Sequence, residues 1–418
     1  MRSAWLLLTV LFWSSFCAAS EWVFSSPLQV TANSGQRVFH HLESAGRRNI
    51  AVSGDTVAIT WEDDRDGTPR VYMAVKKHSA PDFSADMKVS GNGEAYEPSV
   101  IGLAGEQFLV AWEENEQVMA RITGPQGPGP AIRLSNTAGG QPSLSRYGDE
   151  VIIVWSEREG RFGHIRIAQL GIENSPELNI TSSCADDVKA VEDEQLYPAV
   201  AEVAGEVVVA WEDRRFGHTV IMAAQGKPCN FSAAKRISEK IEQRSVTYGK
   251  GHGVSRVALA AYGSNALLAA WADKRDFREG YDIFAAGYQG GKGFSVNMRV
   301  QDDFGGVARQ WHPTVTGSND GRLLVAWTDE REGNSDIMMS AYSDGEWDED
   351  MPLSGESGPA EHAHPSIILD NDDRLHIAWI ERDSRDAPTI LKYMVGSTPV
   401  HLSFRLESCS LKVIKINT

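Results

Sequence analysis

Residues 323–331 read Leu-Leu-Val-Ala-Trp-Thr-Asp-Glu-Arg, an apolar run that ends in Trp327 and is followed by acidic residues and Arg331. The same pattern, a short apolar run ending in tryptophan with an acidic residue close behind it, occurs seven times. The seven tryptophans are Trp61, Trp112, Trp155, Trp211, Trp271, Trp327 and Trp379. Successive copies lie 43 to 60 residues apart, and a repeat of this length indicates a radial or solenoid architecture.

Each repeat contains four short segments with the character of β-strands. In five repeats a proline followed by small and apolar residues opens the unit, as in His312-Pro313-Thr314-Val315, and proline is tolerated at the start of a strand. The second segment is continuously apolar, as in 151–155, which suits a strand buried on both faces. A third strand follows the acidic turn, and a more polar fourth ends the unit. The sequence therefore predicts an all-β fold, a seven-bladed β-propeller of four-stranded antiparallel blades.

The repeat resembles the blades of secreted bacterial propellers in the sialidase-like (BNR-repeat) superfamily. The similarity lies in the strand, the Trp-x-Asp-x-Arg-x-Gly turn and the preceding His-Pro-small-Val segment, and it extends over essentially all of the chain after residue 20. It is a resemblance of architecture only. The sialidase box is present only as the degenerate Ser343-Asp344-Gly345-Glu346-Trp347, and the Phe-Arg-Ile-Pro segment is absent. The resemblance therefore implies a fold and does not supply an arginine-triad active site.

The two ends of the chain differ from the repeats. Arg2, the apolar run 4–16 and the small residues that follow have the layout of a secretory signal peptide, so we expect a secreted or periplasmic protein. The expected divisions are a signal peptide at 1–20, the propeller at 21–400, and one or two extra C-terminal strands at 401–418.

Closure of the ring is predicted from the N-terminal segment 27–31, which reads like the fourth strands elsewhere. We expect it to form the outer strand of the last blade beside 389–393, because such pairing removes an exposed sheet edge.

Charge and cysteine content narrow the classes of partner. With 57 Asp+Glu against 40 Lys+Arg the formal net charge is −17, which argues against nucleic-acid binding and against docking on anionic lipid. No later apolar stretch approaches the length of a membrane span, so we expect no membrane insertion. Three cysteines follow the signal peptide: Cys184, Cys229 and Cys409. A disulfide between Cys184 and Cys229 and three buried thiols both remain open.

The recurrent motif residues have a structural interpretation. The tryptophan ends a buried strand and is expected to pack between blades, so Trp327→Ala should cost about 3–5 kcal/mol of stability. The Asp and Arg behind it are expected to cap the turn and pair within or between blades. For an exposed pair, Arg331→Ala should cost about 1 kcal/mol or less.

Functional residues are expected where the repeats differ. In an up-and-down blade, the turn after the second strand and the entry to the first strand share one face of the ring, with the entry residues nearest the channel. Repeats one and five lack the entry proline and carry Arg48 and Arg256 near that position. The candidate acid–base residues on this face are Tyr197, His252, His312 and His364, and the candidate ligand-binding residues are Arg48, Arg256 and Trp311. Tyrosine and histidine can exchange protons with a substrate, and arginine can clamp an anion.

Two classes of function fit these observations. A glycan- or protein-binding assembly module is favoured, because the motifs are mostly repetitive and no catalytic signature is recognisable. The alternative is a carbohydrate-active enzyme, either a glycoside hydrolase with paired carboxylates or a polysaccharide lyase that uses His and Tyr as base and acid and Arg to neutralise a uronate. No cofactor is expected: His362 and His364 lack a third metal ligand in sequence reach, and the acidic turn 63–67 departs from an EF-hand, which leaves calcium only weakly indicated.

Overall fold

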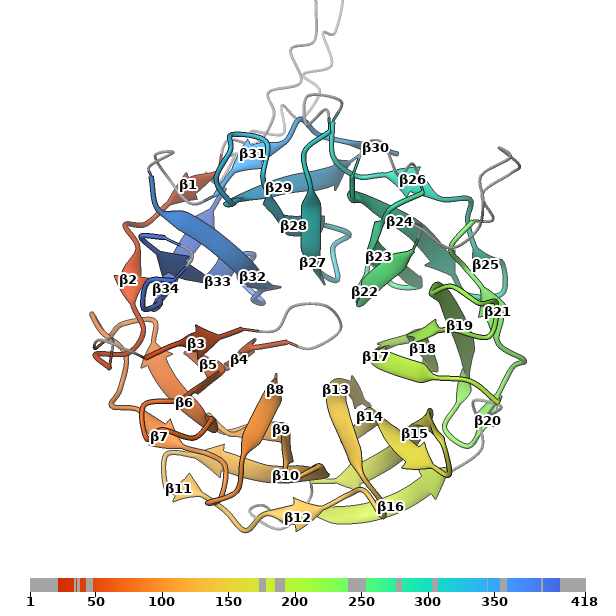
Figure 1. Ribbon diagram of the computed structural model, residues 1–418, viewed down its shortest axis with the longest axis horizontal. Coiled ribbons are helices and arrows are strands. Elements are labelled where there is room, and N and C mark those ends of the chain that lie inside the picture. The colour runs from red at the N-terminus through yellow and green to blue at the C-terminus, as the bar shows by residue number, and fades with distance from the viewer. Residues whose placement is uncertain are drawn as a thin grey trace, which may run out of the picture.

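The computed structural model describes residues 22–398, apart from 34, 36–37, 43–47, 173–177, 185–191, 240–252, 276–279, 303–306, 344, 354–358 and 385. Seven small antiparallel sheets are arranged around a central channel (Figure 1). The described residues contain strands and turns but no helix, so no helix in this part of the chain could cross a membrane. The predicted all-β fold, a seven-bladed β-propeller, is confirmed.

The blades follow one another along the chain, and each begins with the strand nearest the channel. Blade 1 contains β3 (His40–His41), β4 (Ile50–Ser53), β5 (Thr56–Asp63), β6 (Arg70–Lys77) and β7 (Met87–Lys88). Blade 2 contains β8 (Ala95–Gly102), β9 (Phe108–Glu114), β10 (Gln117–Gly124), β11 (Gly127–Pro128) and β12 (Ile132–Arg133). Blade 3 contains β13 (Gly139–Tyr147), β14 (Glu150–Glu159), β15 (Phe162–Gly171) and β16 (Asn179–Cys184).

The remaining blades repeat this order. Blade 4 contains β17 (Gln195–Val203), β18 (Glu206–Asp213), β19 (Val220–Lys227), β20 (Asn230–Phe231) and β21 (Lys235–Arg236). Blade 5 contains β22 (Val254–Tyr262), β23 (Ala266–Asp273), β24 (Asp282–Gln289), β25 (Gly293–Phe294) and β26 (Met298–Arg299). Blade 6 contains β27 (Gln310–Gly317), β28 (Leu323–Asp329), β29 (Asp336–Ser343), β30 (Glu346–Trp347) and β31 (Met351–Pro352). Blade 7 contains β32 (Glu361–Leu369), β33 (Leu375–Arg382) and β34 (Ile390–Ser397), and β1 (Val23–Phe24) and β2 (Leu28–Gln29) complete it.

The ring is closed by a blade made from both ends of the chain. Leu28 pairs with Tyr393, the Val30 N–H donates to the carbonyl of Leu391 at 2.9 Å, and β1 pairs with the far end of β34. The predicted closure is therefore confirmed, and β1 extends it beyond the expected segment. Residues 1–21 and 399–418 lie outside the described residues, so the signal peptide and the C-terminal strands stay predictions.

The recurrent tryptophans are buried between blades, as predicted. Trp327 is fully buried and packs with apolar residues of blades 5 and 6. Its indole N–H donates to the carboxylate of Asp329 at 2.8 Å, and the tryptophans of the first five repeats make the same bond to the acidic residue two positions on. In the seventh repeat the indole N–H of Trp379 has no hydrogen-bond partner among the described residues. The acidic residue of the motif thus satisfies an indole N–H that would otherwise be buried without a partner.

The arginine of the motif is not an exposed partner. The Arg331 side chain is only 12% exposed and bridges two buried carboxylates, that of Asp329 at 2.8 Å and that of Asp350 at 2.6 Å. Asp302, which follows the last strand of blade 5, lies 3.3 Å away. The expectation of a weak surface pair is therefore wrong for Arg331. Asp302 follows β26 of blade 5 and Asp350 directly precedes β31 of blade 6. A motif confined to one turn does not reveal these two partners.

Only part of the disulfide prediction can be followed. Cys229 is disulfide-bonded, but the side chain of Cys184 lies outside the described residues. The pairing of these two cysteines stays a prediction.

Candidate active site

The entry residue of each blade from 2 to 7 has an unusual backbone conformation. These residues lie in the left-handed region with φ between 49° and 62°, and they are Glu97, Gln141, Tyr197, Arg256, His312 and His364. Each sits in a β-bulge between the first two strands of its blade. A bulge redirects a side chain, and a left-handed non-glycine residue costs roughly 1–2 kcal/mol. Because the conformation recurs in six blades, it belongs to the repeat, and only the residue types distinguish one blade from another.

The bulges are held by the preceding blade. In three cases the N–H of the bulge residue donates to the side chain directly behind the tryptophan of that blade. The pairs are Glu97 with Glu62 at 2.7 Å, Arg256 with Glu212 at 2.8 Å, and His364 with Thr328 at 3.1 Å. Sequence reasoning missed these positioning residues, although their fixed place after the tryptophan is a signal that could have found them.

Four side chains from blades 4 to 7 form a continuous row at this end of the channel. The Arg256 guanidinium lies over the ring of Tyr197, 3.7 Å from its centroid. His312 and His364 are stacked with ring centroids 4.2 Å apart. The charge of Arg256 also acts on His312, where it contributes to the lowered pKa of that imidazole. The predicted candidates Tyr197, Arg256, His312 and His364 therefore lie together.

His312 is held in its neutral form. Burial, followed by the charges of His364 and Arg256, lowers its pKa well below the usual value, because a desolvated imidazole beside cations resists protonation. Its Nδ1 has no hydrogen-bond partner among the described residues. A neutral imidazole next to a guanidinium can accept a proton from a ligand that the guanidinium binds.

The rim is chemically asymmetric. At the equivalent bulges, blades 2 and 3 carry an acidic residue, Glu97, and a neutral amide, Gln141. Blades 4 to 7 carry Tyr, Arg and His side chains there. The Gln141 side-chain oxygen accepts a hydrogen bond from the backbone N–H of Tyr197 at 2.7 Å. Gln141 therefore positions one end of the row. The carboxylates of Glu62 and Glu212 hold backbone N–H groups.

Trp311 borders the row and is engaged by its neighbours. Its ring stacks on Tyr281 with centroids 5.2 Å apart, and its N–H donates to Glu330 at 3.1 Å. The ring centroid of His312 lies 6.1 Å away. His252, the remaining histidine candidate, lies outside the described residues.

Arg48 does not join the row. Its guanidinium crosses the channel and donates to the carbonyl of Leu259 in blade 5 at 3.2 Å. It lines a cavity of about 300 Å³ together with Arg146 and the last residues of the inner strands, at the opposite end from the bulges. Burial lowers the pKa of Arg48. Repeat one lacks the entry proline like repeat five, but its arginine occupies the position of that proline and is directed down the channel.

His362 and His364 have separate surroundings. His362 is buried, with Nδ1 2.9 Å from Asp336 and Nε2 3.3 Å from Glu381, whereas His364 stacks on His312. The bulge between these strands gives the two histidines different partners. The pair does not have the arrangement of a chelate.

Comparison with known proteins shows the fold. No family model and no curated protein matches the chain. Two solved structures of an ulvan lyase, described as a new family of polysaccharide lyase, are similar to it with TM-scores of 0.55 and 0.56 at 10% and 9% identity, and each alignment covers 84% of this chain and 93% of the lyase. The phage phi92 endosialidase aligns with a TM-score of 0.46 at 8% identity, over 94% of this chain and 71% of that chain. The similarity to the ulvan lyase structures shows the fold, which is the architecture that the predicted resemblance implied.

Proposed function

We propose that this protein is a polysaccharide lyase that cleaves a uronate-containing glycan at the channel mouth lined by Tyr197, Arg256, His312 and His364. The observation that carries the proposal is the stacking of Arg256 on Tyr197, together with a buried His312 whose pKa is lowered by burial, by His364 and by the Arg256 charge. Of the two classes considered from the sequence, this favours the enzyme over the binding module, since a ligand-binding rim does not require a histidine kept neutral beside an arginine.

The proposed reaction is a β-elimination. Arg256 pairs with the uronate carboxylate and reduces its negative charge, which makes the adjacent C5 proton more acidic. His312 accepts that proton, the C4–O4 bond breaks, and a C4=C5 double bond forms. The hydroxyl of Tyr197 donates a proton to the leaving oxygen. One glycosidic bond is thus exchanged for one double bond, and no water is consumed.

Two further observations support a glycan substrate. One of the ulvan lyase structures with this fold is bound to -[GlcA(1-4)Rha3S]-, which contains a uronate. The predicted export of this chain would bring it to extracellular or periplasmic polysaccharide. A glycoside hydrolase is less favoured, because Glu62 and Glu212, two carboxylates at this end of the blades, are engaged with backbone N–H groups.

The test is a panel of polyuronates and sulfated uronate polysaccharides, with product followed by the ultraviolet absorbance of the unsaturated uronate. We expect Arg256→Ala to lower kcat by about 10²–10³-fold and Tyr197→Phe and His312→Ala by about 10²–10⁴-fold, with melting temperatures near that of the wild type. Glu97→Ala is the matched control, since it alters the same bulge position on the opposite side of the rim. Binding of a glycan without any turnover would reject the lyase proposal and favour the glycan-binding module instead.

A further inference from the structure

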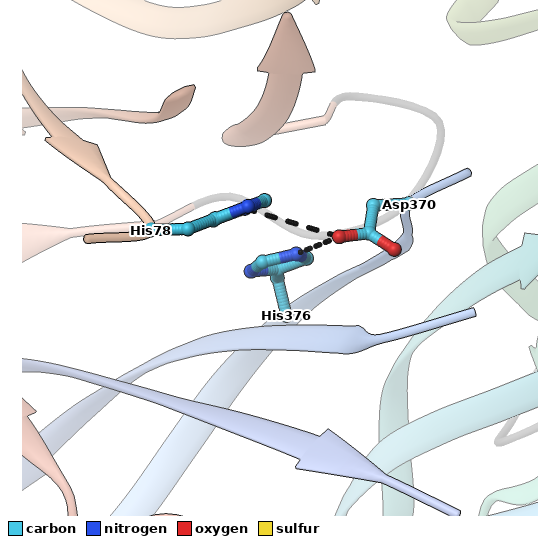
Figure 2. Close-up of side chains that lie close together, drawn as sticks. All are labelled: His78, Asp370 and His376. Carbon is cyan, nitrogen blue, oxygen red and sulfur yellow. Dashed lines mark hydrogen bonds and ion pairs between the residues drawn. The ribbon is translucent and has the colours of Figure 1, made fainter. Parts of the chain in front are cut away.

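We propose that His78, Asp370 and His376 form a binding site for a divalent transition metal such as Zn²⁺, at the seam where blade 7 meets blade 1. His78 directly follows β6 of blade 1, Asp370 follows β32, and His376 lies in β33 of blade 7 (Figure 2). This site is separate from the channel mouth, and the proposal does not depend on the lyase activity.

The three side chains converge on one point. His376 Nε2 lies 3.0 Å from Asp370 Oδ2 and His78 Nε2 lies 3.8 Å from the same oxygen, and all three ligand atoms lie within 4.8 Å of one another. Figure 2 shows both imidazoles directed toward this carboxylate. Tetrahedral zinc, with bonds of about 2.0–2.1 Å, separates its ligand atoms by roughly 3.3 Å. The site therefore needs only small side-chain movements and leaves a fourth position open.

The ligands are already oriented by outer hydrogen bonds. His376 Nδ1 lies 2.7 Å from the hydroxyl of Tyr393, and Asp370 Oδ1 accepts the backbone N–H groups of Asp372 at 2.8 Å and Arg374 at 2.9 Å. Such partners for the outer atoms of histidine and carboxylate ligands are a regular feature of metal sites.

One ligand atom has no competing hydrogen bond. The Nε2 atom of His78 is buried and has no hydrogen-bond partner among the described residues, and it lies 3.8 Å from Asp370 Oδ2. Arg374 also contacts Asp370 Oδ2 at 2.8 Å. Because it pairs with the exposed Asp372 at 2.7 Å as well, it can leave the shared oxygen to the metal and keep a carboxylate partner.

The location gives the metal a structural consequence. His78 belongs to the first blade and the other two ligands to the last, so an ion at this point joins the blades on either side of the ring closure. His78 lies far in sequence from Asp370 and His376, so the three ligands are not assembled in the unfolded chain. Metal binding should therefore stabilise the folded ring in proportion to the logarithm of metal concentration.

The experiment uses the full untagged chain after removal of metal with a chelator. Zn²⁺ titrated by calorimetry should bind with one equivalent at this site and raise the melting temperature progressively, and Co²⁺ should give the visible absorption of a tetrahedral site. His78→Ala should weaken Zn²⁺ affinity beyond the roughly 10–100-fold typical of outer-partner mutations. Its metal-free melting temperature should lie close to that of the metal-free wild type, because Nε2 of His78 has no hydrogen-bond partner among the described residues and the change removes a ring stacked on His376 at 5.3 Å.

His218→Ala is the matched control, because His218 lies on a turn of blade 4, and its Zn²⁺ affinity should equal that of the wild type. Absence of saturable binding in the wild type would overturn the proposal. Unchanged affinity in His78→Ala, or an equal loss in His218→Ala, would overturn it as well.

Discussion

Arg331→Ala tests whether the turn arginine stabilises the propeller. The side chain is 12% exposed, and its partners Asp329 and Asp350 have side chains 1% and 0% exposed. Removing the guanidinium leaves two buried carboxylates without their cation, a change that costs about 3–5 kcal/mol in buried pairs. We therefore expect a loss of about 3–5 kcal/mol in the free energy of unfolding, comparable with that expected for Trp327→Ala.

The assay is denaturant unfolding at neutral pH and fixed ionic strength, with the midpoint and slope compared between variants. Arg382→Ala is the matched control. Arg382 is the last residue of β33 in blade 7. Its pair with Glu361 is 2.6 Å long, but the two side chains are 33% and 26% exposed, so its loss should cost about 1 kcal/mol or less. Adding Asp350→Asn to Arg331→Ala should restore part of the stability, because it removes an uncompensated charge. A loss below about 1 kcal/mol for Arg331→Ala, equal to that of Arg382→Ala, would refute the argument.

Three further predictions concern the indole bond, His312 and ring closure. Trp327→Phe should destabilise the protein by about 1.5–3 kcal/mol more than Trp379→Phe in denaturant titrations, because of these two tryptophans only Trp327 donates to a buried carboxylate, that of Asp329. Equal losses of stability would count against a role for the indole hydrogen bond. The pKa of His312 is lower in the folded protein than in the unfolded chain, so below about pH 6.5 the unfolded chain binds a proton that the folded protein does not. Acidification should therefore lower the free energy of unfolding by up to about 1.4 kcal/mol per pH unit. His312→Asn should therefore lose less stability than the wild type between pH 7.5 and 5.5, and parallel losses would contradict this. Deleting 22–31 should lower the melting temperature, since it exposes the edge of β34, and an unchanged value would argue against closure by this segment.

The architecture was predictable from the sequence because it depends on local, repeated patterns. An apolar strand ending in a tryptophan such as Trp327, followed by an acidic residue two positions later, recurs at a spacing that accommodates one blade. The closure of the ring by 27–31 was also readable, since that segment carries the pattern of a fourth strand without the first three. Even the convergence of Tyr197, Arg256, His312 and His364 followed from position, because entry residues of successive blades meet at one end of the channel.

The tertiary structure decided whatever depends on contacts between blades. Arg331 looked like a solvent-exposed turn residue, but it pairs with Asp302 and Asp350, which lie next to the outer strands of blades 5 and 6. Arg48 and Arg256 both replace or precede a missing proline, yet a one-residue difference in register sends the first down the channel and leaves the second at the mouth. His78 meets Asp370 and His376 only because the ring closes. The repeated pattern along the chain determines which residues form the strands of each blade. It does not determine how neighbouring blades are aligned, and that alignment decides which side chains meet between them.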